Sequence, residues 1–106
     1  MRRFKTLKRN QLGVDFKASL FNDNKSVFDL TNNTVLSCIF KRPGGTTITK
    51  TGVLDGAANL GKLIYTNEDP EASILDEVGS WYYKFDVTMT DNDFIPGDWI
   101  EFEVRE

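Results

Sequence analysis

The stretch that most resembles a catalytic motif is the glycine-rich segment at residues 56–62, GAANLGK. It contains most of a P-loop, in which glycine N–H groups cradle phosphates and a lysine reaches them. The motif also requires a serine or threonine next, to hold magnesium, and a helix whose N-terminus faces the phosphates. Here Leu63 follows, and residues 63–65 are typical of a strand. We therefore interpret the segment as a loop between two strands.

Metal-binding chemistry has few candidate ligands in this chain. It contains no histidine and one cysteine, Cys38, which cannot make a closed zinc site. Asp91 and Asp93 resemble the start of a calcium loop, but an EF-hand beginning at Asp91 requires a glycine where the chain has Pro96. We expect solvated turn aspartates here, with a looser calcium site as the alternative. We predict no metal and no cofactor.

Acid–base and nucleophilic catalysis also lack a distinctive arrangement. Sixteen carboxylates make some pair at glycosidase distance inevitable, so finding such a pair carries little information. Serine and cysteine nucleophiles usually need a histidine or a comparable base. Cys38 lies among apolar neighbours, which is typical of an inert core residue. We therefore predict no catalytic residues and a protein that is not an enzyme.

Length and composition predict a single globular domain over residues 1–106. The chain is 40% hydrophobic and 27% charged, which is ordinary for such a domain. It has no stretch approaching the ~18 apolar residues of a membrane span, so we expect no membrane partner. Its basic start is not followed by the apolar segment of a secretion signal. We therefore expect synthesis inside a cell, in the cytoplasm.

The net charge of −3 conceals an uneven distribution. Five of the thirteen basic residues lie in the first nine positions: Arg2, Arg3, Lys5, Lys8 and Arg9. The rest of the chain is therefore strongly acidic, which argues against nucleic-acid binding because phosphate contacts need a basic surface. The basic start is either an arm that docks on an acidic partner or a solvated first strand.

The clearest predicted element is a strand that begins at Gly79 and ends near Asp91. Apolar residues alternate with polar ones from Trp81 to Met89, which indicates one buried face and one face near water. Further strands are expected at residues 3–9, 13–21, 34–41, 46–54, 62–66 and 99–104. The strand at 34–41 is apolar on both faces and suits a central position, whereas the threonine-rich run at 46–54 suits an edge.

Turn residues separate these strands. Pro43 and Gly44 occupy the middle of a predicted type II turn, and a second Pro–Gly turn is expected at residues 95–98. Asp69 and Pro70 suit the start of a helical turn. The chain is thus predicted to be an all-β, immunoglobulin-like antiparallel β-sandwich of seven to eight strands with one short helical turn. The predicted core comprises Val14, Phe16, Leu20, Leu36, Cys38, Phe40, Trp81, Tyr83, Phe85, Val87, Ile100 and Phe102.

Two aromatic residues depart from the alternation of their strands. Tyr82 and Trp99 fall on nominally polar faces, beside Lys84 and Glu101. Exposed aromatics of this kind stack on sugars or anchor a protein interface, or loops and the N-terminal strand cover them. All three interpretations stay open. The predicted contact residues are Arg2, Arg3, Lys5, Tyr82 and Trp99.

The order of these segments resembles the N-terminal domain of the upper baseplate proteins of siphophages that infect Gram-positive bacteria. DLT at 29–31 precedes a strand at 35–40, and Lys41 to Gly44 begins a turn resembling "k-x-P-x-G". GKLIY at 61–65 resembles "G-k-v-x-y", and GSWYYKFDV at 79–87 resembles "G-x-Y-x-x-e-f-x-v". Residues 102–104 close the pattern, which covers roughly residues 3–104.

The resemblance implies a non-enzymatic structural or adaptor component of a bacteriophage virion, in the tail tip or baseplate, that serves host attachment through protein–protein contacts. The implied partners are other virion proteins, with homo-oligomers within the particle. Family members usually continue into a helical linker and a C-terminal domain that holds receptor-binding proteins. Ending at Glu106, the chain is expected to be an excised domain or a relative from the neck, head or tail tube. The alternative is a carbohydrate-binding or adhesion module, which predicts that Tyr82 and Trp99 are exposed and coplanar.

Overall fold

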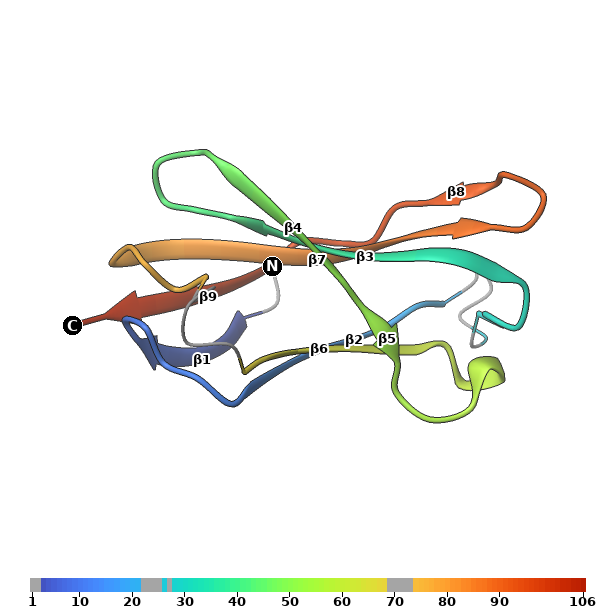
Figure 1. Ribbon diagram of the computed structural model, residues 1–106, viewed down its shortest axis with the longest axis horizontal. Helices are drawn as coiled ribbons and strands as arrows, with labels where there is room; N and C mark the ends of the chain where they lie inside the picture. Colours follow the sequence, from blue (N-terminus) through green and yellow to red (C-terminus); the bar gives the residue numbers. More distant parts are fainter. Residues whose placement is uncertain (1–2, 22–25, 27, 69–73) are drawn as a thin grey trace.

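The computed structural model describes residues 3–21, 26, 28–68 and 74–106 (Figure 1). Strands make up most of these residues, with one 3-10 turn at Ala58–Leu60. The helical turn predicted at Asp69 and Pro70 lies outside the described residues. The strands are β1 Arg3–Lys8, β2 Val14–Ser19, β3 Asn33–Lys41, β4 Thr47–Thr51, β5 Val53–Leu54, β6 Lys62–Asn67, β7 Gly79–Met89, β8 Phe94–Ile95 and β9 Ile100–Arg105.

The strands form two sheets that lie as two layers (Figure 1). The larger sheet has the order β1-β9-β7-β3-β4, with β8 also pairing with β7, and the smaller sheet has the order β2-β6-β5. In the smaller sheet and at the centre of the larger one, this is the strand order of an immunoglobulin-like sandwich. The predicted fold class is therefore confirmed, as are the interior position of β3 and the edge position of β4.

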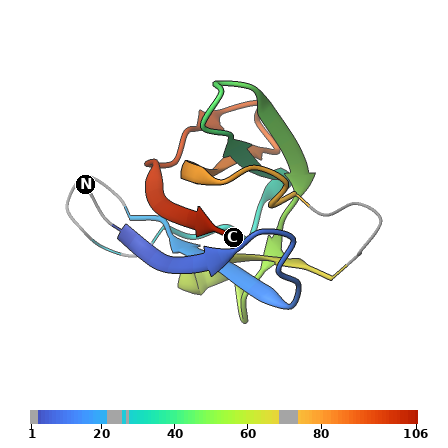
Figure 2. The same cartoon turned by 90° about the vertical axis from the view of Figure 1, so that its left-hand side faces the viewer.

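The N-terminal strand departs from the predicted antiparallel arrangement. β1 pairs with β9 in parallel, with Thr6 opposite Glu103 and Lys8 opposite Arg105. All other strand pairs among the described residues are antiparallel. Figure 2 shows β1 beside β9 at one side of the sandwich. Residues 3–8 of the basic start are therefore an edge strand of the larger sheet.

The predicted edge strand at residues 46–54 is two strands in different sheets. β4 pairs with β3 in the larger sheet, whereas β5 pairs with β6 in the smaller one. Gly52 lies at the crossing and is buried. A Cβ at this position would lie 3.0 Å from the Phe85 ring, so the absence of a side chain allows the chain to cross close to the core.

The core lies between the two sheets and contains the predicted residues. All of them are buried except Leu36, which is half-buried and packs against the others. Six further buried residues belong to the core and were not among those predicted: Leu7, Leu30, Leu63, Ile74, Leu75 and Val104. The Tyr83 hydroxyl donates a 2.8 Å hydrogen bond to the Lys17 carbonyl, which links β7 of one sheet to β2 of the other.

The turn between β3 and β4 is not the type II turn predicted from Pro43 and Gly44. A type II turn places its second central residue at positive φ. Here the residue with positive φ is Gly45, at 96°, and the Gly45 N–H bonds the Arg42 carbonyl. This pattern is that of a type I turn followed by a left-handed residue, a common hairpin connection.

Candidate functional site

A β-bulge interrupts the partner of β7 at residues 96–99. β8 and β9 both pair with β7, with Ile95 opposite Val87 and Ile100 opposite Tyr83. Ile100 is five residues after Ile95, whereas their partners Val87 and Tyr83 are only four residues apart. The segment therefore contains one residue more than the strand it faces, which defines a bulge. The predicted chain-reversing turn at Pro96 and Gly97 is wrong, because the chain keeps its direction through this segment.

Gly97 allows the bulge to lie against β7. A Cβ at Gly97 would be 2.1 Å from the carbonyl oxygen of Phe85, a distance that no side chain tolerates. The Gly97 N–H donates a 3.0 Å hydrogen bond to Oδ1 of Asp86. Asp86 is 7% exposed and its Oδ1 also lies 3.4 Å from Nζ of Lys84. One buried carboxylate thus holds both the bulge and a lysine.

The bulge places Trp99 beside the outward side chains of β7. Nζ of Lys84 lies 5.0 Å from the centre of the Trp99 ring, within the range of a cation–π contact. The Tyr82 and Trp99 rings are 6.5 Å apart and inclined at 77°. Tyr82, Lys84 and Trp99 are all half-buried. The structure therefore brings together the two aromatic residues singled out in the sequence.

Strand register extends this cluster across the sheet, because directly opposed residues share a face. We define the outer face as the outward side chains of β3, β7, β8 and β9 together with Trp99. One row across it contains Lys41, Tyr82 and Glu101. The next contains Ile39, Lys84 and Trp99, and the row nearest the β8 hairpin contains Val35, Thr88 and Phe94.

Two apolar side chains of the outer face are largely exposed. Val35 is 51% exposed and Phe94 is 58% exposed. Phe94 was not predicted, because it lies in a two-residue strand that alternation alone does not reveal. The register Val87–Ile95 and Thr88–Phe94 fixes its direction, since Val87 is buried and Thr88 is its outward neighbour. The outer face thus combines three aromatic rings with two aliphatic side chains.

Two of the three predicted N-terminal contact residues, Arg3 and Lys5, belong to the edge strand of the same sheet. Arg2 lies outside the described residues. The backbones of Arg3 and Lys5 belong to β1, with Arg3 opposite Glu101, while their side chains are outside the description. The structure therefore places this part of the basic start two strands from β7, paired within the domain.

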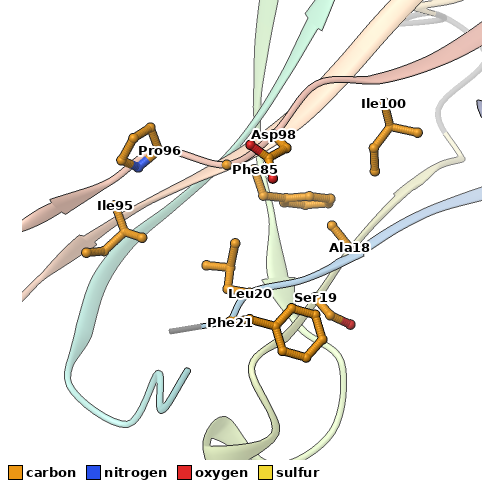
Figure 3. Close-up of a pocket in the computed structure, with 10 residues that line it drawn as sticks. Ala18, Ser19, Leu20, Phe21, Phe85, Ile95, Pro96, Asp98 and Ile100 are labelled. Atoms are coloured by element: carbon orange, nitrogen blue, oxygen red, sulfur yellow. The ribbon is translucent and has the colours of Figure 1, made fainter. Parts of the chain in front are cut away.

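A small pocket and a more open depression lie near the bulge and the β7–β8 turn. The pocket, of about 150 Å³, lies between β2 and the bulge, with Leu20, Phe85, Ile95 and Ile100 among its lining residues (Figure 3). It is smaller than the ~300 Å³ at which ligand pockets usually begin, and Asp98 is its one ionisable lining residue. The more open depression, of about 530 Å³, borders the β7–β8 turn, next to Asp91 and Asp93.

The other candidate chemical groups lie apart from one another. Burial raises the pKa of the Cys38 thiol, which disfavours the reactive thiolate. Asp91 Oδ1 accepts the Asp93 N–H at 3.1 Å, within a turn. No three His, Cys, Asp or Glu residues gather as metal ligands in the described part of the chain. Residues 56–62 form a loop and a 3-10 turn that leads into β6, as interpreted from the sequence.

The described residues contain no helix long and apolar enough to cross a membrane. The fold and the surface together define an immunoglobulin-like β-sandwich with an aromatic outer face on its larger sheet. No protein-family model matches the chain, and the search of curated proteins gave no match. The resemblance to the siphophage baseplate domain therefore stays a prediction.

Proposed function

We propose that the protein is a non-enzymatic structural or adaptor component of a bacteriophage virion, in the tail tip or baseplate, and that it acts through protein–protein contacts. The observation that carries the proposal is the outer face, where Val35 and Phe94 are exposed at one end and Tyr82 and Trp99 are half-buried further along the same face. Aromatic residues within an apolar patch are typical of the energetic centre of a protein interface. The assignment to a virion comes from the resemblance of the sequence.

The ring geometry favours a protein partner over a polysaccharide. A carbohydrate platform requires exposed, coplanar rings, whereas Tyr82 and Trp99 are half-buried and inclined at 77°. Lys84 also lies over the Trp99 ring. A protein surface can fit such a relief, because its side chains fill the space between inclined rings.

Immunogold electron microscopy on purified phage particles tests this function. Antibody raised against the chain is applied to particles from the source culture, and antibody pre-absorbed with the purified chain serves as the control. We expect label at the tail tip or baseplate. Label at the head, neck or tube would retain the structural role and contradict the position. Particles that carry no label above the control would contradict the proposal.

A further inference from the structure

We propose that a second copy of this chain covers the outer face, with a twofold axis that lies in the interface and runs along β7. This inference rests on the proposed function, since it names one partner for the same surface. It follows from how unlike side chains are distributed on the two sides of β7.

Each of three rows carries different chemistry on its two sides. In the row through Tyr82, basic Lys41 lies on the β3 side and acidic Glu101 on the β9 side. In the row through Lys84, aliphatic Ile39 lies on the β3 side and Trp99 on the other. In the row through Thr88, Val35 lies on the β3 side and Phe94 on the other.

A twofold axis along β7 makes these rows complementary. Rotation about that axis places each row of one copy opposite the same row of the other copy. It also places the β9 side of one copy over the β3 side of the other. Lys41 then faces Glu101 of the second copy, and Ile39 faces the Trp99 indole of the second copy. Val35 likewise faces the Phe94 ring of the second copy.

A twofold axis across the strands would give a poorer match. It would place β9 over β9 and reverse the order of the rows. Acidic side chains would then approach other acidic side chains, or charged rows would cover apolar rows. The pattern of the outer face therefore selects the axis along β7.

The residues on the axis accept a second copy at close range. Lys84 lies near the axis, but its charge is balanced by Asp86, whose Oδ1 is 3.4 Å from Nζ. Two copies therefore do not present bare ammonium groups to each other. Tyr82 lies in the same column, where its half-buried ring can pack on its symmetry mate.

The outward surface of the whole larger sheet, which extends the outer face over β1 and β4, has the size of a protein interface. β7 has eleven residues, which extend about 36 Å, and the five main strands are about 19 Å across at ordinary strand spacing. The flat area is therefore at most about 700 Å², near the ~800 Å² that each partner buries in a standard interface.

Pairing through the edge at β4 is disfavoured, because Lys50 shares the inward direction of its partner Cys38 and inward charges protect edge strands.

Charge reversal tests the axis directly. Sedimentation equilibrium of the full chain is measured over a concentration series for wild type, Lys41→Glu, Glu101→Lys and the double variant. We expect wild type to dimerise and each single reversal to weaken the dimer at least about tenfold, because like charges then face each other. The double variant restores opposite charges across the axis, so its dissociation constant should return to within about threefold of the wild-type value.

Lys62→Glu is the matched control, since Lys62 is an exposed lysine on a strand of the smaller sheet. It should leave dimerisation unchanged, and thermal melts establish that each variant is folded. Dimers that tolerate both single reversals, or a double variant that fails to recover, would overturn the proposal.

A wild-type chain that stays monomeric up to about 1 mM, where only millimolar or weaker association would remain, would also overturn it. That last result would leave the proposed function standing if the chain is still found in particles, with a different virion protein on the outer face. Absence from particles combined with dimerisation would instead contradict the proposed function alone.

Discussion

The outward surfaces of the two sheets differ although both sheets cover the same core. On the smaller sheet, Thr66 donates a 2.6 Å hydrogen bond to Asp15, and Lys17 lies 3.8 Å from Asp55. On the larger sheet, polar groups share the surface with Tyr82, Phe94 and Trp99. A sandwich needs only its inner faces to be apolar, so the architecture by itself does not call for aromatic rings on the outer face.

The bulge at residues 96–99 explains much of this difference. Both β8 and β9 pair with β7, and the bulge adds one residue between them. It also places Trp99 beside Lys84. Bulges redirect side chains and are frequent beside functional sites. The smaller sheet pairs β2 with β6 over six residues in unbroken register. The proposed function accordingly assigns the contact to the larger sheet, while the smaller sheet also exposes one apolar side chain, Val53.

The largest effect on stability is expected from the core, which lies between the two sheets. Phe85 is 1% exposed and contacts the crossing point at Gly52. Phe85→Ala should lower the free energy of unfolding by about 3–5 kcal/mol, because it leaves a cavity in the core. Chemical denaturation measures the change. Unfolding at the wild-type denaturant concentration would show that the assigned register of β7 is wrong.

The next largest effect is expected at the bulge. Gly97→Ala should destabilise the fold by about 2–3 kcal/mol, at the upper end of overpacking effects, because the obstacle is the Phe85 backbone rather than a side chain. It should also move Trp99 and change its fluorescence spectrum. Gly44→Ala is the control, since its φ is not positive and the nearest atom to a Cβ is 3.6 Å away. Equal stability of the two variants would contradict the close approach.

Asp86 should have a smaller effect, exerted through the same bulge. Asp86→Ala should cost about 1–2 kcal/mol, because the half-buried Gly97 N–H loses its acceptor. Asp86→Asn retains an acceptor oxygen and should restore part of this loss, although it removes the charge that balances Lys84. Thermal denaturation of the pair separates the two contributions. Identical melting temperatures for both variants would show that the Gly97 hydrogen bond does not contribute.

The smallest effect on folding is expected on the two outward surfaces themselves. Phe94 and Val53 are exposed to almost the same extent, 58% and 56%, on opposite sheets. Replacing either residue with serine should change the free energy of unfolding by no more than about 0.5 kcal/mol. Only Phe94→Ser should reduce self-association in sedimentation experiments. A loss of association in Val53→Ser instead would assign the contact to the smaller sheet.

Much of the fold follows from local patterns. Alternation from Trp81 to Met89 predicted β7, and the same reasoning identified the main strands and most of the core. Ile74 and Leu75 escaped because their segment has no periodicity. It is held by tertiary contacts, in which Arg42 pairs with Asp76 at 2.9 Å and the Trp81 indole donates to the Glu77 carbonyl at 2.9 Å.

The candidate site was only partly predictable. Tyr82 and Trp99 were identifiable because they interrupt the polar side of their strands. Phe94 and the bulge were not, because Pro96–Gly97 has the same local sequence signal in a turn as in a bulge. What distinguishes the two is the contact of Gly97 with Phe85, which joins residues distant in the chain. The switch of sheets at Gly52 escaped for the same reason.

Hydroxyl-radical footprinting tests most directly whether the outer face is the contact surface. Oxidation of aromatic side chains is compared between the dilute isolated chain and the chain within purified particles. Phe21 is the internal control, because it is 58% exposed like Phe94 and lies in the chain just beyond β2 of the other sheet. We predict that assembly protects Phe94 and Trp99 and leaves Phe21 unchanged. Protection of Phe21 with undiminished oxidation of Phe94 would contradict the account.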